Sequence, residues 1–484
     1  MKFVYTFCFL ILTLQVYPHT VITGTGSGSI NQTDMTGLNP GDTLAIRSGY
    51  YEMGGSLFNL KRITIINYRG PVDFGKTVRL GNLKQVSFSG GGWKTETYGF
   101  RFRNFSGDAF SLESSCSNLS ISYCEYYNLN GIAFNASHFF TTYTGDTSTM
   151  ALYKATFNNQ RLIHSGALFA GSWVSNAQFQ NVVDSISFLH IEIDSTNGDG
   201  VQVIGHSIYR MLASHWHIQG PVPNGIHDVG VFYTSGNGTV CNIYRKNGWG
   251  YLWRVWNLGL NGRANSYLYN CIDLSTENYG TVDTRLDVAD TTTGNDIPFI
   301  RGASLHVINN TTGNKKTKNY VSELVIAGNF CSANGYRLEV RNNLCFNNVA
   351  TGTDHIIKQN TGEQLTDTSN NIYSENPIRD ELLLDTLECK LNPASRAIDQ
   401  GLNFPFISTD IEGVPRPVGK SADIGAREFP DAAAIRPPLQ VFSLKKWLAF
   451  SLGTLTIALI LLSSSRGVRN KIRETTYKVE SQPQ

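Results

Sequence analysis

The sequence predicts an all-β fold, a right-handed parallel β-helix, followed by one C-terminal transmembrane helix. Short apolar or β-branched runs recur with starts about 20 to 35 residues apart, a spacing typical of a solenoid with one unit per repeat. Most runs end in Gly, Asn or Asp, the residues that punctuate strands. No amphipathic helical stretch of useful length separates the runs, which argues against the crossover helices of a doubly wound sheet.

The N-terminal residues 1–20 predict a signal peptide. Lys2 precedes an apolar run over 3–16, and Pro18 and polar residues follow it. The run is short for a bilayer span, although an uncleaved N-terminal anchor remains the alternative. Only 16% of the 484 residues are charged and the formal net charge is +2, so we expect no nucleic-acid partner.

Residues 21–390 are expected to form the β-helix. Strand length alone leaves a β-sandwich open, but asparagines follow the runs directly, as in Asn342-Asn343 and Asn370-Asn371. Asn tolerates the left-handed backbone of a tight corner. Stacked Asn side chains from successive coils can then hydrogen-bond one another, which favours the solenoid.

A polar stripe is predicted where two strands carry alternating residues. Ile191 and Ile193 share one side of their strand, which places His190, Glu192 and Asp194 on the other side. One coil later, His215 and His217 alternate with Trp216 and Ile218 in the same way. Stacked, the five polar side chains could perform acid/base work or bind a divalent metal. The alternative is an ordinary solvent-exposed face.

Two stretches then carry a resemblance to a known group of proteins. Residues 40–51, Pro-Gly-Asp-Thr-Leu-Ala-Ile-Arg-Ser-Gly-Tyr-Tyr, resemble the opening coil of exported right-handed parallel β-helix proteins related to pectate lyases. Residues 397–401, 410–417 and 423–429 resemble the closing module of many bacterial surface β-helices, often found before an anchor. In this module Asp410, Arg416, Asp423 and Glu428 are expected to form a buried ion-pair network that covers the last coil.

The resemblance adds candidate catalytic residues. Asn197-Gly198-Asp199-Gly200 is similar to the Asn-x-Asp-Gly element of polygalacturonase-like β-helices, in which an Asp serves in acid catalysis. The resemblance makes Asp199 a catalytic candidate, although Asp-Gly is also a common turn pair. Glu192 and His217 of the polar stripe, and Asp228 in His227-Asp228-Val229-Gly230, are the other catalytic candidates. His190, Asp194, His215, His227 and Arg254 are the candidates for substrate binding. Lyase chemistry of the pectate type would add calcium and an Arg or Lys near the sugar, so the cofactor stays open.

The C-terminal part predicts a membrane anchor. After the closing module, 391–429, come a Pro-containing linker, 430–446, and an apolar segment, 447–465, about the length of a bilayer crossing. Basic residues are more frequent after this segment, so the tail, 466–484, is expected in the cytoplasm and the β-helix outside, in a single-pass protein at the cell membrane.

The cysteines and the motifs together bound the function. Seven cysteines lie beyond the signal and form no CxxC pair, so we assign no metal ligand and expect buried, apolar cysteines more than disulfides. We expect a monomeric bacterial surface protein that binds a polysaccharide or cell-surface glycan and cleaves it by hydrolysis or β-elimination. The alternative is a non-catalytic adhesin or structural glycan-binding protein.

Overall fold

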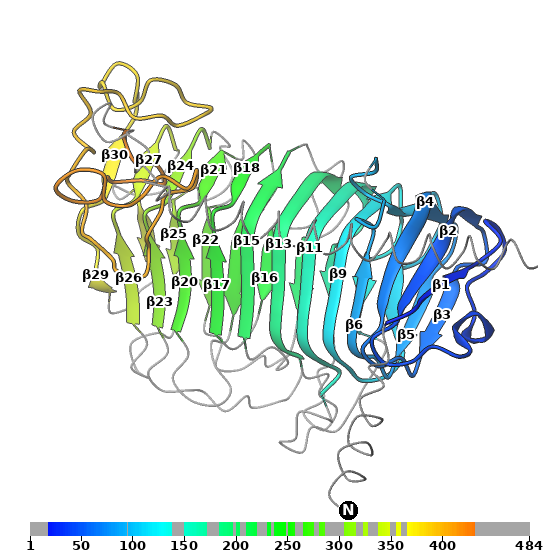
Figure 1. Cartoon of the computed structure of the whole chain (residues 1–484). Helices are drawn as coiled ribbons and strands as arrows, with labels where there is room; N and C mark the ends of the chain where they lie inside the picture. The colour runs from blue at the N-terminus through cyan, green and yellow to red at the C-terminus, as the bar shows by residue number, and fades with distance from the viewer. Residues whose placement is uncertain are drawn as a thin grey trace, which may run out of the picture. The chain divides into compact units, whose positions relative to one another are not determined.

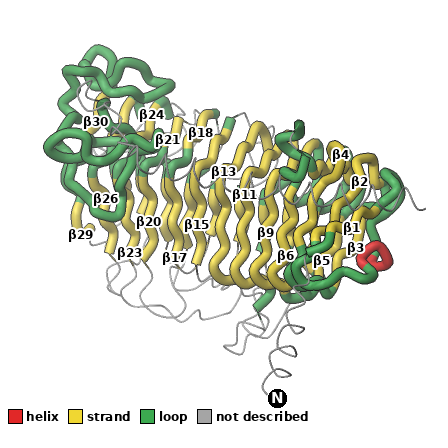
Figure 2. The backbone as a smooth tube through the Cα atoms, in the orientation of Figure 1, coloured by secondary structure: helices red, strands yellow, loops and turns green. Residues whose placement is uncertain are grey.

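In the computed structural model of the protein, the described residues are 18–430, with gaps at 94, 138–149, 172–182, 197–199, 204–209, 220–229, 234–236, 248–249, 257–264, 275–279, 286–303, 316–322, 328–336, 349–354 and 360–364. They contain thirty strands and the short 3-10 helix η1 (Gln32–Met35). The strands stack in a row along one axis (Figure 1), and strands and loops alternate around it (Figure 2).

The strands form two sheets. The 19-stranded sheet contains β1 (Thr20–Thr23), β2 (Thr43–Tyr51), β4 (Thr64–Phe74), β6 (Lys84–Ser89), β7 (Phe100–Arg103), β9 (Cys116–Tyr127), β11 (Leu152–Ser165), β13 (Val183–Thr196), β15 (Arg210–Ile218), β17 (Asn237–Cys241), β18 (Tyr244–Lys246), β20 (Asn265–Tyr269), β21 (Ile272–Leu274), β23 (Ser304–Ile308), β24 (Thr311–Gly313), β26 (Arg337–Arg341), β27 (Leu344–Phe346), β29 (Leu365–Asp367) and β30 (Ile372–Ser374). The 11-stranded sheet contains β3 (Gly55–Phe58), β5 (Val78–Gly81), β8 (Phe110–Leu112), β10 (Phe134–Asn135), β12 (Phe169–Ala170), β14 (Val201–Val203), β16 (Val231–Tyr233), β19 (Trp253–Trp256), β22 (Val282–Arg285), β25 (Val325–Ala327) and β28 (Ile357–Gln359).

Each strand pairs in parallel with the strand one coil further along the chain, as β9, β11, β13 and β15 do in turn. A sandwich would be built from antiparallel neighbours. The register therefore confirms the predicted parallel β-helix and excludes the sandwich.

One column of left-handed residues divides the larger sheet. Its members occupy the same register position in successive coils and have φ between 51° and 61°: Tyr123, Asn159, His190, His215, Asn242, Asn270, Asn309, Asn342 and Asn370. We call this column the corner. The part of the larger sheet before the corner is face 1, the part after it is face 2, and the 11-stranded sheet is face 3.

The predicted asparagine ladder runs along this corner. Asn342 Nδ2 donates to Asn309 Oδ1 at 3.0 Å, and Asn270 Nδ2 donates to Asn242 Oδ1 at 3.3 Å. A second, inner ladder follows one residue later, where Asn343 Nδ2 donates to Asn371 Oδ1 at 3.0 Å. The amides thus hold neighbouring coils together, because each side chain satisfies a group one coil away.

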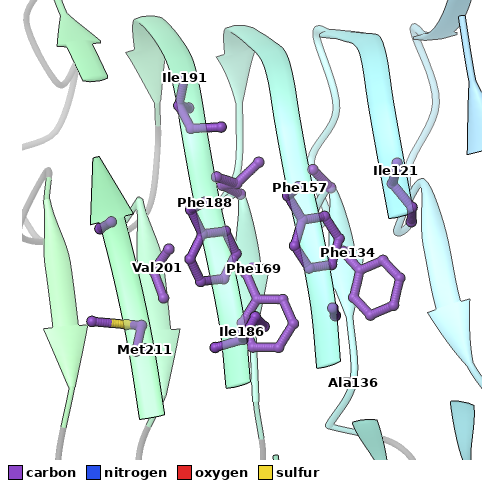
Figure 3. Close-up of a cluster of buried hydrophobic side chains, with 14 of the residues drawn as sticks. Ile121, Phe134, Ala136, Phe157, Phe169, Ile186, Phe188, Ile191, Val201 and Met211 are labelled. Carbon is purple, nitrogen blue, oxygen red and sulfur yellow. The ribbon is translucent and has the colours of Figure 1, made fainter. Parts of the chain in front are cut away.

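The interior is filled by stacked aromatic side chains. Phe157 of face 1 and Phe188 one coil later stack with centroids 5.2 Å apart and planes 15° from parallel. Phe134 and Phe169 of face 3 stack at 5.7 Å and 8°. Figure 3 shows the four rings together in the core. Stacking like residues at one register position lets neighbouring coils keep the same cross-section there.

The cysteines are part of this interior. Six of them, Cys116, Cys124, Cys241, Cys271, Cys345 and Cys389, are buried and carry free thiols, while Cys331 lies outside the described residues. Burial raises the pKa of each of the first two thiols, Cys116 and Cys124, well above its usual range. Their burial agrees with the expectation that they act as small core residues.

The segment that follows β30, residues 375–429, is called here the closing segment. It packs along face 2 of the C-terminal coils, where Ile424 and Ala426 join Ile272 and Leu344 in one buried cluster. The corner asparagines bind its backbone, as when Asn342 Nδ2 donates to Leu402 O at 2.8 Å. The expectation was a cover for the last coil. The closing segment instead lies along the flank of several coils (Figure 1).

The ion-pair network predicted in this segment is present. Arg416 Nε lies 3.2 Å from Glu428 Oε1, and both side chains are buried. Asp410 Oδ2 accepts from the Glu428 backbone N–H at 2.9 Å, and Asp423 Oδ2 accepts from that of Phe429. These groups hold the fold of the segment and do not face solvent.

None of the described residues forms a helix with the length and apolarity of a bilayer crossing. The predicted signal peptide, 1–20, lies almost entirely outside the described residues, and the predicted linker, membrane span and tail lie outside them beyond residue 430.

Candidate functional site

The alternation predicted in β13 and β15 is present. Ile191 and Ile193 are buried, whereas His190, Glu192 and Asp194 are exposed. In β15, Trp216 and Ile218 are buried, and His215 and His217 are exposed. The two strands are neighbours, with Glu192 paired to His217 in register. The five polar side chains therefore project outward from two adjacent coils.

They do not form one flat cluster, however. His190 and His215 occupy the left-handed corner, with φ of 52° and 60°, and their rings lie 5.0 Å apart. Burial and the neighbouring His190 lower the pKa of His215. Glu192, Asp194 and His217 lie on face 2. The alternation holds from His190 to Asp194, but the backbone turns at His190 and His215, so the five outward side chains spread from the corner onto face 2.

Glu192 and His217 belong to a longer column of polar side chains on face 2. The members follow one another in register along the axis: Asp73, Arg101, Glu125, Arg161, Glu192, His217 and Tyr244. We call this set the face 2 column. Acidic and basic side chains alternate over its first five positions, so each carboxylate has a guanidinium one coil away.

Ion pairs connect these coils. Arg161 lies between two carboxylates, 3.7 Å from Glu125 and 3.5 Å from Glu192. Arg103, two residues after Arg101, reaches Glu125 at 2.5 Å and Asp73 at 3.6 Å. The Glu125 side chain is 11% exposed and the Glu192 side chain 54% exposed. Glu192 is therefore the carboxylate of the column that a ligand can reach most easily.

A short segment before β7 lies over the column. Arg101 Nε donates to Tyr98 O at 3.0 Å and its guanidinium also pairs with Glu96, which holds this segment down. Burial, together with the nearby Glu192 carboxylate, raises the pKa of the Tyr98 phenol well above its usual range. Tyr98 and Glu192 thus form one edge of a partly covered track.

Four of the predicted site residues lie outside β13 and β15. Asp199, His227 and Asp228 are outside the described residues. Arg254 lies on β19 of face 3, paired with Asp283 at 3.4 Å and placed over the Tyr251 ring at 5.0 Å. Arg254 therefore does not join Glu192, because its strand belongs to a different side of the coil.

Arg245 of β18, the strand that carries the last residue of the face 2 column, points inward. It is fully buried and its Nε and Nη2 donate to Asp273 at 2.8 Å each. Lys315 donates to the same carboxylate at 2.7 Å. We call Arg245, Asp273 and Lys315 the internal ion cluster. Its contacts make it a structural element of the interior.

Calcium does not fit the described part of the face 2 column. The carboxylates of Asp73, Glu125 and Glu192 are separated by guanidinium groups, whereas calcium takes six to eight oxygen ligands converging at one point. Among the described residues no group of three or more His, Cys, Asp or Glu side chains is arranged to hold a metal ion.

Sequence reasoning missed Asp73, Arg101, Arg103, Glu125 and Arg161. Each stands at an outward position of a strand, so alternation gives a local signal. These side chains lie side by side because their strands pair in register. That register depends on the length of each coil, which varies along the chain and leaves no local signal in the sequence.

Among known proteins, similarity is found to solved structures alone, at low identity. No protein-family model matches the sequence, and no curated protein matches it. The crystal structure of pectate lyase Pel9A is similar with a TM-score of 0.38 and 12% identity, over 84% of this chain and 98% of that one. The PL6 family polysaccharide lyase Pedsa3628 from Pseudopedobacter saltans has a TM-score of 0.38 and 10% identity, over 81% and 99%. The assignment of the fold rests on the strand register.

Proposed function

We propose that the protein binds a polysaccharide along face 2, with the sugar chain parallel to the coil axis. The observation that carries this proposal is the face 2 column, in which successive coils present a carboxylate, a guanidinium or an imidazole. Neighbouring strands are about 4.8 Å apart, so each coil offers one polar group at a regular interval. Sugar hydroxyls both donate and accept hydrogen bonds, and an alternation of acceptors and donors suits them.

Cleavage of the bound chain is the further step of this proposal. Glu192 is exposed, paired in register with His217, and close enough to Tyr98 to raise the pKa of its phenol. These groups can pass a proton to or from a glycosidic oxygen or a sugar carbon, and general acid–base catalysis needs such a pair within reach. Asp199 and Asp228 stay the other catalytic candidates, and His190, Asp194, His215 and His227 the candidates for substrate binding.

A non-catalytic glycan-binding protein is the second candidate. The observation that favours it is the pairing of Glu125 with two arginines and of Glu192 with one, because carboxylates held in ion pairs are poor proton donors. Binding is common to both candidates, and turnover separates them.

The test uses the full chain and a panel of soluble polysaccharides, acidic and neutral, with affinity electrophoresis for binding and reducing-end and ultraviolet assays for cleavage. Glu192→Gln removes the accessible charge and should weaken binding about 10- to 150-fold, since hydrogen bonds to charged groups contribute about 1.5 to 3 kcal/mol. Ser187→Ala, on face 1 of the same strand, is the matched control. Equal binding by both variants and the unchanged protein would exclude face 2 as the binding surface.

We further propose that the protein is exported and held at the cell surface. The support is the apolar segment 447–465 with its basic flank, together with the apolar run at 3–16. Alkaline extraction of membranes tests whether the chain is anchored in the bilayer. Protease added to intact cells tests whether the β-helix lies on the outer side of the membrane. A chain that alkali extracts, or that stays protected from external protease, would contradict the proposal.

A further inference from the structure

A chain of three polar side chains lies on face 1 of the C-terminal coils, away from the face 2 column. Ser304 and His306 occupy alternate positions of β23, so both project from the same side of the strand. Glu339 lies on β26 and is paired in register with His306. The fold thus places a hydroxyl, an imidazole and a carboxylate next to one another.

Their hydrogen bonds run in one direction. His306 Nδ1 contacts Glu339 Oε2, and His306 Nε2 lies 3.0 Å from Ser304 Oγ. Arg341 Nε is 3.1 Å from the other oxygen of Glu339, and the hydrogen bond from His306 lowers the pKa of Glu339. An ionised carboxylate can only accept, so Nδ1 carries the hydrogen and the Nε2 of the neutral imidazole faces Ser304 as an acceptor.

The serine hydroxyl has two acceptors within reach. Its Oγ lies 2.5 Å from Asn265 Oδ1 as well as 3.0 Å from His306 Nε2. Rotation about the Cβ–Oγ bond therefore moves the single proton between the amide and the imidazole. In one orientation the hydroxyl donates to Asn265 Oδ1. In the other it donates to His306 Nε2, the group that can remove its proton.

Aromatic side chains fix this arrangement and border it. The Tyr267 ring stacks on the His306 ring with centroids 4.7 Å apart and planes 12° from parallel, which orients the imidazole. Phe406 of the closing segment stands edge-on to Tyr267 at 5.2 Å and is 50% exposed. The hydrogen-bonded chain thus lies beside an accessible aromatic ring.

We propose that Ser304, His306 and Glu339 form an acyl-transfer site that hydrolyses a carboxylic ester, with Ser304 as nucleophile, His306 as base and Glu339 as the group that orients the imidazole. A nucleophile within hydrogen-bond distance of a base, which a third group orients, is the arrangement such catalysis needs. Neither Ser304 nor Glu339 belongs to the face 2 column.

The reaction balances with water as the only co-substrate. Ser304 Oγ attacks the ester carbonyl carbon while its proton passes to His306 Nε2. The carbon–oxygen bond to the alcohol then breaks, and Nε2–H protonates the leaving oxygen. Water attacks the acyl-serine, gives its proton to Nε2, and releases the carboxylic acid while the proton returns to Ser304 Oγ.

The surroundings select the substrate class. Ser304 is only 7% exposed, so the acyl group that reaches it must be small, such as acetyl. The exposed Phe406 ring offers a flat apolar surface of the kind on which the C–H face of a sugar ring packs. A sugar O-acetyl ester fits both features. The choice of a sugar as the alcohol rests on the proposed function, whereas the assignment of Ser304, His306 and Glu339 as an acyl-transfer site does not.

The experiment treats the full chain with a fluorophosphonate probe and, separately, with 4-nitrophenyl acetate. The probe should label Ser304, as peptide mass spectrometry will identify, and the acetate should be hydrolysed. Ser304→Ala should abolish labelling, and Ser304→Ala, His306→Ala and Glu339→Gln should each lower the hydrolysis rate about 10³- to 10⁴-fold. Ser187→Ala, which removes a hydroxyl from face 1 several coils away, should change neither.

Labelling of the unchanged protein needs no variant, so misfolding of a variant does not obscure the outcome. A folded chain that the probe leaves unlabelled at Ser304, or a Ser304→Ala protein that still hydrolyses the acetate at the original rate, would overturn the proposal. Loss of glycan binding in Glu192→Gln with ester hydrolysis intact would show that the two surfaces act separately. Ester hydrolysis without any glycan binding would support the roles of Ser304, His306 and Glu339 and refute the proposed function.

Discussion

Replacing Asn342 by Ala is expected to release the closing segment from the corner. The Asn342 side chain makes three hydrogen bonds, through Nδ2 to Asn309 Oδ1 at 3.0 Å and to Leu402 O at 2.8 Å, and through Oδ1 from Leu402 N at 3.0 Å. Each contributes about 1 kcal/mol, and alanine in a left-handed conformation adds about 1 kcal/mol of strain. The free energy of unfolding should fall by about 4 kcal/mol.

Asn128→Ala is the matched control. Asn128 also has a left-handed backbone, with φ of 53° against 56° for Asn342, but its exposed side chain makes one described hydrogen bond, to Asn104. The backbone strain is common to both variants, so Asn128→Ala should cost about 2 kcal/mol. Urea unfolding measures both losses, and hydrogen exchange at the Leu402 amide should accelerate only in the first variant. Equal losses, with Leu402 exchange unchanged, would refute the role assigned to the buried corner amides.

Three further predictions concern the interior. Asp273→Asn should lower the free energy of unfolding by about 3 to 5 kcal/mol in urea, because it removes the carboxylate that Arg245 and Lys315 contact; a loss below about 1 kcal/mol would contradict this. Burial lowers the pKa of Lys315 from 10.5 to about 8. Between these two pKa values the unfolded chain binds more protons than the folded one. The free energy of unfolding of the protein should therefore rise with pH by up to about 3 kcal/mol. Lys315→Met should flatten this rise, as urea unfolding at several pH values in this range will measure. Phe157→Ala should cost about 3 to 5 kcal/mol by opening a cavity beside Phe188, and Phe157→Leu less than half of that, in the same assay.

The architecture could be predicted because its signals are local. Alternation in β13 and β15 identifies the outward residues around Glu192 and His217 correctly, since neighbouring side chains of a strand always point to opposite sides. Asn342 and Asn370 mark a left-handed corner, because Asn adopts that backbone more readily than most residues.

The candidate site could be predicted only in part. His190 and His215 continue the alternation in the sequence, yet they turn the corner, and no local pattern distinguishes these two interpretations. Glu125 and Arg161 lie beside Glu192 because of coil register, which depends on the length of every intervening loop. The same holds for Ser304, His306 and Glu339, whose third member comes from the next coil.

The closing segment gives the face 2 column a direction. The column ends at Tyr244, whose hydroxyl donates to Leu387 O of this segment at 3.1 Å. The next positions in register, Ile272, Thr311 and Leu344, are buried. A polymer lying on the column can continue past Asp73 at the opposite end but is stopped at Tyr244. The face 2 column is therefore blocked at one end. If a polysaccharide binds there as proposed, one end of the sugar chain lies at Tyr244, and the position of the bond that is cleaved is set by its distance from that end.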